Sequence, residues 1–101
     1  MMRTVVWTET AEKSYKDNLE YLSEYWSKKE IRTFMDKVDE AISNIMIYPF
    51  MGSISNDHIQ YRKYLIVPQI YLYYRITPEK IYLVAFWNNF QNPDHLKELL
   101  T

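Results

Sequence analysis

Two apolar helical faces in immediate succession constrain the fold of this chain more than any other feature. The first lies in residues 8–26, where apolar side chains recur three or four positions apart: Ala11, Tyr15, Leu19, Leu22 and Trp26. Ser27 and Glu30 then have the S-x-x-E spacing of a capping box, so a second helix begins at once. Pro49 ends that helix, whose apolar face consists of Ile31, Phe34, Val38, Ile42 and Ile45. Two amphipathic helices joined so tightly predict an antiparallel hairpin.

Short runs outside the hairpin predict the strands on which it packs. Residues 4–7 form a first short strand, and Thr8 caps the first helix. Residues 61–67, 70–76 and 80–87 alternate as strands do, and connections of two or three residues force them into an antiparallel meander. Residues 53–58 are expected to form a loop. Asp94 can cap a short last helix that carries Leu96, Leu99 and Leu100.

The fold class is therefore α+β: an N-terminal short strand, a two-helix antiparallel hairpin packed on an antiparallel β-sheet, and a short C-terminal helix. At this length we expect one domain over residues 1–101.

Both faces of this sheet are expected to be apolar or aromatic. Ile70, Leu72, Tyr74 and Ile76 share one face of their strand, and the alternation in the last strand groups Ile81, Leu83, Ala85 and Trp87. The hairpin covers one face, so the last helix and a protein partner are expected to cover the second. The expected partner-binding residues are Tyr71, Tyr73, Arg75, Tyr82, Val84 and Phe86.

The composition excludes several classes of function. The chain has no Cys, and its two histidines, His58 and His95, are far apart, so we expect no disulfide and no metal site. A single glycine leaves no glycine-rich phosphate loop, and no cofactor is expected. The net charge of −1 does not favour nucleic-acid binding by overall charge. Because no stretch is typical of a signal peptide or a membrane span, we expect a cytoplasmic protein that does not enter a membrane.

Several short motifs, in this order and spacing, resemble the RelE/ParE toxin superfamily over nearly the whole chain. They are Trp7-Thr8 with Ala11, Leu19 and Leu22, Pro49-x-x-Gly52, Arg62-Lys63, Tyr74-Arg75-Ile76, and Phe86-Trp87 ahead of Asn92-Pro93-x-x-Leu96. The resemblance implies a helical hairpin on a twisted sheet. It also implies the toxin of a bacterial type II toxin–antitoxin module, the kind known from plasmid stabilization, held inactive by a cognate antitoxin that wraps around it.

The superfamily divides by target, and this sequence departs from one of its branches. RelE-like members cut messenger RNA in the ribosomal A site, whereas ParE-like members poison DNA gyrase. Active nucleases commonly have an arginine just after the last strand and another near the start of the third strand, where this chain has Phe90 and Tyr71. RNA cleavage needs cationic groups at the scissile phosphate. We therefore expect a ParE-like, non-nucleolytic mode of action and no enzymatic activity.

Two alternatives stay open. The first is a ribosome-dependent messenger-RNA endonuclease, whose candidate catalytic residues are Arg62, Lys63, Arg75 and His95. Each of these also has an ordinary interpretation: a solvated strand start for Arg62 and Lys63, an antitoxin contact for Arg75, and an exposed surface residue for His95. The second is a degenerate toxin that acts only as a protein-binding module.

Overall fold

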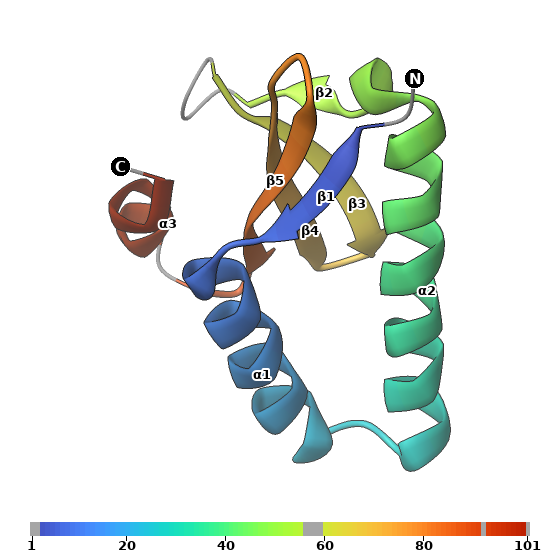
Figure 1. Ribbon diagram of the computed structural model, residues 1–101. Coiled ribbons are helices and arrows are strands. Elements are labelled where there is room, and N and C mark those ends of the chain that lie inside the picture. Colours follow the sequence, from blue (N-terminus) through green and yellow to red (C-terminus); the bar gives the residue numbers. More distant parts are fainter. Residues whose placement is uncertain (1–2, 56–59, 92, 101) are drawn as a thin grey trace.

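The structure, a computed structural model, describes residues 3–55, 60–91 and 93–100, with side chains described for all of these except 93, 94 and 97. Its elements follow one another as β1 (Thr4–Trp7), α1 (Glu9–Ser23), α2 (Lys28–Ile47), the 3-10 turn η1 (Pro49–Met51), β2 (Ser53–Ile54), β3 (Arg62–Val67), β4 (Ile70–Ile76), β5 (Lys80–Asn88) and α3 (Pro93–Leu100) (Figure 1). His58, Asn92 and the predicted cap Asp94 lie outside the described residues and side chains. No described helix is long and apolar enough to cross a membrane.

Both hairpin helices begin at the predicted caps. The Ala11 N–H donates to the Thr8 hydroxyl oxygen at 3.1 Å. At the second helix, the Glu30 N–H donates to Ser27 Oγ at 3.2 Å, and the Ser27 N–H donates to the Glu30 carboxylate at 3.1 Å. The capping box is thus complete, and these bonds satisfy amide groups that a helix end leaves without a partner.

The sheet has the strand order β1-β5-β4-β3-β2 within the described residues. Strands β2 to β5 are antiparallel neighbours, whereas β1 pairs with β5 in parallel. The α+β class is confirmed. The sheet is mixed rather than purely antiparallel, because β1 runs parallel to its neighbour β5. The loop prediction is wrong for Ser53 and Ile54, which pair with Lys63 and Arg62. Two residues are too short for an alternating pattern to reveal them.

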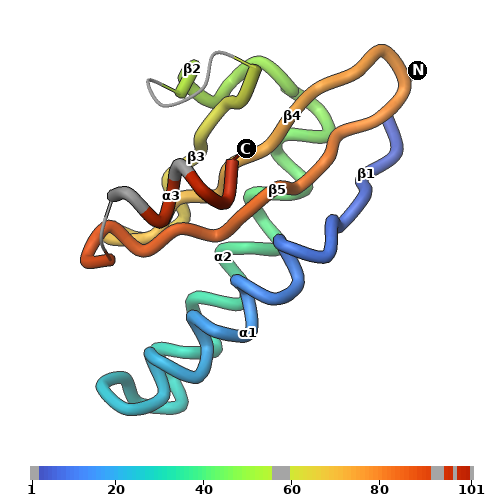
Figure 2. The backbone as a smooth tube through the Cα atoms, turned by 90° about the vertical axis from the view of Figure 1, so that its left-hand side faces the viewer, coloured from blue at the N-terminus to red at the C-terminus, as the bar shows by residue number. Residues whose placement is uncertain are grey.

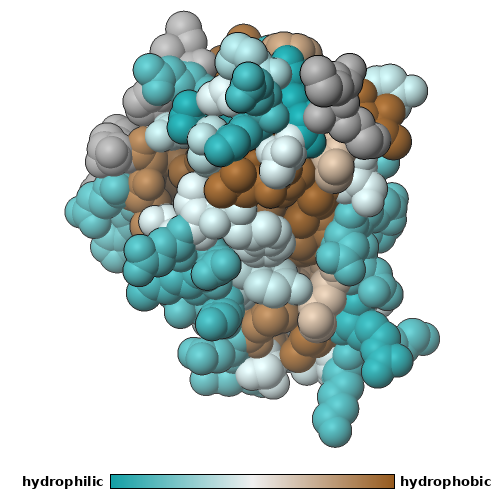
Figure 3. Space-filling view, viewed as in Figure 1, coloured by the Kyte–Doolittle hydropathy of each residue, from teal (hydrophilic) through white to brown (hydrophobic). Residues whose placement is uncertain are grey.

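The elements form three layers, with α1 and α2 on one side of the sheet and α3 on the other (Figures 1 and 2). The hairpin side holds the main core, in which Leu22, Phe34 and Val38 are buried as predicted and Ile42 packs against them. Hydrophilic residues cover the outer sides of both helices, and a strip of apolar and pale residues runs between them (Figure 3). The predicted helical faces therefore cover the sheet.

A bulge in β5 changes which side chains face the hairpin. Tyr73 pairs with Ala85 and Tyr74 with Leu83, so Val84 is an extra residue with no partner in β4. After Val84, each β5 side chain therefore points to the face opposite the one that a regular two-residue alternation predicts. Phe86 points into the hairpin core, 1% exposed and stacked on Trp7 with ring centroids 5.5 Å apart. The prediction that Phe86 lies on the second face is therefore wrong, and Trp87 lies there instead.

Side chains of α1 satisfy the edge of β5 beyond the end of β1. The Phe86 N–H donates to Ser14 Oγ at 2.9 Å, and Asn18 Nδ2 donates to the Phe86 carbonyl at 3.0 Å. Three residues earlier in β5, the hydroxyl of Thr8, the N-cap of α1, donates to the Leu83 carbonyl at 2.7 Å. Because these buried groups have no water to bind, the helix replaces the missing strand.

Replacing Phe34 by Ala is expected to lower the free energy of unfolding by about 3–5 kcal/mol, because it leaves a cavity under the hairpin. Met35, the next residue, is exposed, so Met35→Ala serves as the matched control and should change stability by less than about 1 kcal/mol. Chemical denaturation of both variants checks this. Equal losses would contradict the burial of Phe34.

Ser14→Ala is expected to lower the free energy of unfolding by about 1–3 kcal/mol, because it leaves the buried Phe86 N–H without an acceptor. Ser23 lies on the same helix, and its side chain donates to the Glu20 carbonyl in an exposed position, so Ser23→Ala is the matched control. Hydrogen exchange at the Phe86 amide gives a second readout, and an unchanged protection factor in Ser14→Ala would count against the bond.

Candidate functional site

The second face of the sheet is partly covered by α3, which lies across β5 and β4 (Figure 2). Leu96 and Leu100 of this helix pack against Tyr73 and Trp87, and all four side chains are at least 95% buried. The prediction that the last helix covers part of this face agrees with the structure. Tyr73, at 2% exposed, lies beneath α3 and offers no surface to a partner while the helix is in place.

The rest of the second face is partly open to solvent and combines cations with aromatic rings, with Leu65 exposed and its other residues half-buried. Its residues, which we call the open sheet face, are Lys63, Leu65, Tyr71, Arg75, Tyr82 and Val84. Lys63 Nζ lies 5.0 Å from the Tyr71 ring centre, and Arg75 Cζ lies 4.6 Å from that of Tyr82. Neither cation forms an ion pair with a carboxylate among the described residues. The open sheet face can therefore hold an acidic or apolar partner segment.

Arg62 is turned away from this face, because neighbouring residues in a strand point to opposite sides. Its Nη1 donates to the carbonyls of Gly52 at 2.6 Å and Phe50 at 3.2 Å. Its guanidinium also lies over the Phe50 ring, 5.1 Å from the centroid. Arg62 thus stabilises the turn that follows α2. The sequence had suggested only a solvated residue at the start of a strand, and this structural role was not predicted.

The candidate catalytic residues do not converge. Lys63 and Arg75 lie on the open sheet face, Arg62 lies on the hairpin side, and His95 is an exposed residue of α3. Phe90, at the position where an arginine is expected, is 78% exposed, and its N–H donates to Asn88 Oδ1 at 2.9 Å. The residues that the structure describes contain no group of three or more potential metal ligands.

The P-x-x-G motif has a structural role that sequence reasoning did not assign. The Tyr74 hydroxyl donates to the Pro49 carbonyl at 2.8 Å and accepts from the Gly52 N–H at 3.0 Å. A Cβ at Gly52 would lie 2.5 Å from that hydroxyl oxygen, so only glycine permits the approach. Burial raises the pKa of Tyr74, against the opposing effects of the Gly52 hydrogen bond and of Arg62. Tyr74 therefore stays a neutral buried anchor.

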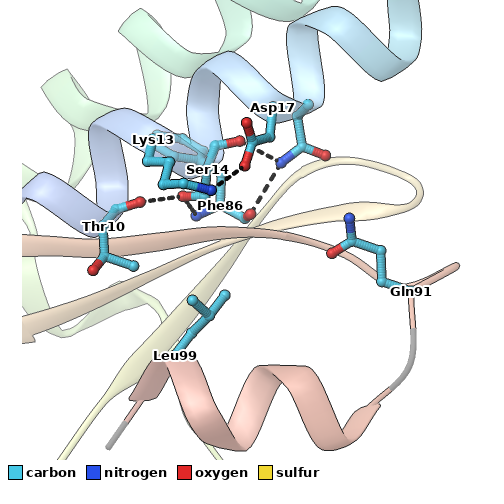
Figure 4. A pocket seen from close by; sticks show the side chains of 8 residues that line it. Thr10, Lys13, Ser14, Asp17, Phe86, Gln91 and Leu99 are labelled. Carbon is cyan, nitrogen blue, oxygen red and sulfur yellow. Dashed lines mark hydrogen bonds and ion pairs between the residues drawn. The ribbon is translucent and has the colours of Figure 1, made fainter.

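A groove lies between α1, the β5–α3 connection and α3 (Figure 4). It has a volume of about 130 Å³ and is lined by Thr10, Lys13, Ser14, Asp17, Asn18, Phe86, Gln91 and Leu99. Gln91 also lines an adjoining hollow of about 80 Å³, with Tyr21, Asn88 and Phe90. No sequence signal pointed to this groove, because its walls come from segments far apart in the chain.

Comparisons with known proteins agree with the resemblance. The family model described as the ParE toxin of the type II toxin–antitoxin system, parDE, matches residues 5–93. No curated protein sequence matches the chain significantly.

Solved structures share the fold at low sequence identity. The chromosomal ParDE toxin–antitoxin system from P. aeruginosa has a TM-score of 0.71 and 12% identity, over 86% of this chain and 96% of that one. The E. coli DinJ-YafQ toxin–antitoxin complex has a TM-score of 0.64 and 11% identity, over 89% and 96%. The YoeB/ParE toxin from Agrobacterium tumefaciens has a TM-score of 0.60 and 17% identity, over 84% and 96%.

Proposed function

The chain belongs to the ParE toxin family of type II toxin–antitoxin systems, within the RelE/ParE superfamily, and from this premise we propose that it acts in a ParE-like, non-nucleolytic way and is neutralised by a cognate antitoxin. The proposed target is DNA gyrase. We place the toxin in the cytoplasm, where both the antitoxin and this target would meet it.

The proposal of a non-nucleolytic mode rests on one observation: the candidate catalytic arginines lie on opposite sides of the sheet. A phosphodiester transition state gains negative charge, and its stabilisation requires donors already aimed at one point. Here Arg62 is held by two carbonyl oxygens on the hairpin side, while Arg75 is stacked on Tyr82 on the other. Phe90 supplies an exposed ring in place of a cation. The two arginines therefore point to opposite sides of the sheet and cannot meet at a single phosphate.

The open sheet face supports the antitoxin proposal. It leaves two tyrosine rings, the apolar Val84 and two cations partly exposed, and neither cation has a carboxylate partner among the described residues. Aromatic residues and arginine dominate binding energy at protein interfaces, and the positive charge favours an acidic antitoxin segment. The proposed contacts are therefore Tyr71, Arg75, Tyr82 and Val84, with Tyr73 and Phe86 removed from the predicted set because both are buried.

Arg75→Glu is expected to raise the dissociation constant of the antitoxin complex by about 10- to 100-fold, because it reverses the charge and removes the stacked guanidinium. Arg32 is an exposed arginine of α2, on the other side of the sheet, so Arg32→Glu is the matched control and should bind as the wild type does. Titration calorimetry with the co-expressed antitoxin measures both. Equal affinities in the two variants would place the antitoxin elsewhere.

One observation favours a messenger-RNA endonuclease as a second candidate. Lys63 and Arg75 share the open sheet face, each beside a tyrosine ring. Such a surface can bind phosphates and stack bases. A third candidate is a degenerate toxin, which binds the antitoxin but neither inhibits gyrase nor cleaves messenger RNA.

Inducing the toxin without its antitoxin separates these candidates. We expect pulse labelling to show arrested DNA replication, with messenger RNA on programmed ribosomes left uncut by the purified protein. Purified gyrase should lose supercoiling activity in its presence. Discrete cuts at A-site codons that disappear in Arg75→Ala would overturn the proposal in favour of the endonuclease, and harmless induction would favour the degenerate toxin.

A further inference from the structure

Three exposed aromatic side chains gather where α1 ends. Tyr21, Tyr25 and Phe90 are 44%, 68% and 78% exposed, and we call them the aromatic patch. The rings of Tyr21 and Tyr25 are in contact, with centroids 5.1 Å apart. Tyr21 and Phe90 line one hollow, although 69 positions separate them in the chain. A single exposed ring needs no explanation, but adjacent rings beside a hollow are typical of an interaction site.

The groove along α1 lies next to this patch. Its walls are α1 on one side and Gln91 and Leu99 on the other, as Figure 4 shows. Gln91 lines both the groove and the hollow beside Tyr21, so the two adjoin at this side chain. Their volumes, about 130 Å³ and 80 Å³, are below the roughly 300 Å³ of a typical small-molecule pocket. Hollows of this size fit one or two side chains of a peptide segment.

The charged residues at the end of α1 are all acidic: residues 17–26 contain three carboxylates and no Lys or Arg, and the nearest basic residues along the chain on the C-terminal side are Lys28 and Lys29 at the start of α2. Asp17 and Glu24 lie four residues before and three residues after Tyr21, on the same side of α1, and Glu20 lies nearby. The last turn of α1 has no basic residue, although a helix C-terminus favours cations. Asp17 pairs with Lys13 at 3.1 Å, but neither Glu20 nor Glu24 has an ion-pair partner within the described part of the chain. The carboxylates and the helix end therefore add to one negative potential.

We propose that the groove and the aromatic patch are a docking site for an arginine-bearing segment of a protein partner. A guanidinium stacks flat on the Tyr25 or Phe90 ring and donates to the Glu24 carboxylate, two interactions that one arginine can make together. An apolar neighbour in the segment fills the groove against Leu99 and Phe86. Nucleic acid is disfavoured, because the carboxylates repel phosphates. The site lies apart from the open sheet face and does not depend on the proposed mode of toxicity.

Titration of the ¹⁵N-labelled full chain with blocked tripeptides tests this directly. The probes are arginine–leucine–arginine, its lysine analogue and its glutamate analogue. We expect saturable shifts at the Tyr21, Tyr25 and Gln91 amides with the arginine peptide, about threefold weaker binding of the lysine peptide, and no shifts with the glutamate peptide.

Substitutions distinguish stacking from general apolar contact. Tyr25→Phe keeps the ring and should bind as the wild type does, whereas Tyr25→Leu keeps an apolar side chain and should bind about two- to fivefold more weakly. Glu24→Gln should weaken binding by a similar factor and reduce its salt dependence. Tyr48, 67% exposed beyond α2, supplies the matched control Tyr48→Leu, which should leave the affinity unchanged.

Three results would overturn the proposal. They are the absence of saturable shifts at millimolar peptide, equal binding by Tyr25→Leu and the wild type, and shifts centred on the open sheet face or near Tyr48. Because the substituted side chains are exposed, we expect each variant to keep the fold, and unshifted amide signals of core residues check this in the same spectra.

Discussion

The hydrogen bonds between α1 and the edge of β5 are the constraint on which the rest of this structure depends. Strand β1 ends opposite Leu83, and the following stretch of β5 is buried beside a helix. Ser14 and Asn18 satisfy the Phe86 N–H and carbonyl, and together with Thr8 they fix how far α1 lies along the strand. An unpaired backbone group at such a site costs about 1–3 kcal/mol, so the polar side chains set the position of an otherwise apolar contact. The position of the hairpin, and hence of α2, follows from this anchor.

The same region determines which surface is free for function. The bulge at Val84 turns Phe86 towards Trp7 and Tyr15 and turns Trp87 towards α3. One side of the sheet is then closed by the hairpin, and the other is divided between a covered part under α3 and the open sheet face. The two adjacent basic residues at the start of β3 point to opposite faces and have different roles. Arg62 stabilises the turn after α2, whereas Lys63 faces solvent beside Tyr71.

Local patterns were sufficient to predict most of the elements, but they did not predict how the last strand is divided between the faces. The helical spacing and the capping residues predicted both hairpin helices, because each signal lies within a few residues of the structure that it specifies. Phe86 and Trp87 were assigned to the wrong faces because a period of two assumes that no residue is inserted, and nothing in the sequence marks Val84 as a bulge. The parallel pairing of β1 and the groove between α1 and α3 depend on contacts across more than 70 positions, which local periodicity does not contain.

The fold also separates two surfaces of opposite charge on a chain whose net charge is −1. Lys63 and Arg75 make the open sheet face positive, and Glu20 and Glu24 make the end of α1 negative. Helix α3 connects them physically, because Leu96 and Leu100 pack on the sheet while Leu99 lines the groove. A segment bound in the groove would contact this helix and stabilise it where it lies on the sheet. By linkage, anything that holds α3 in place would then strengthen binding in the groove. Both surfaces thus border one short helix, because Tyr71 and Val84 of the open sheet face pack against the cluster that Leu96 and Leu100 complete.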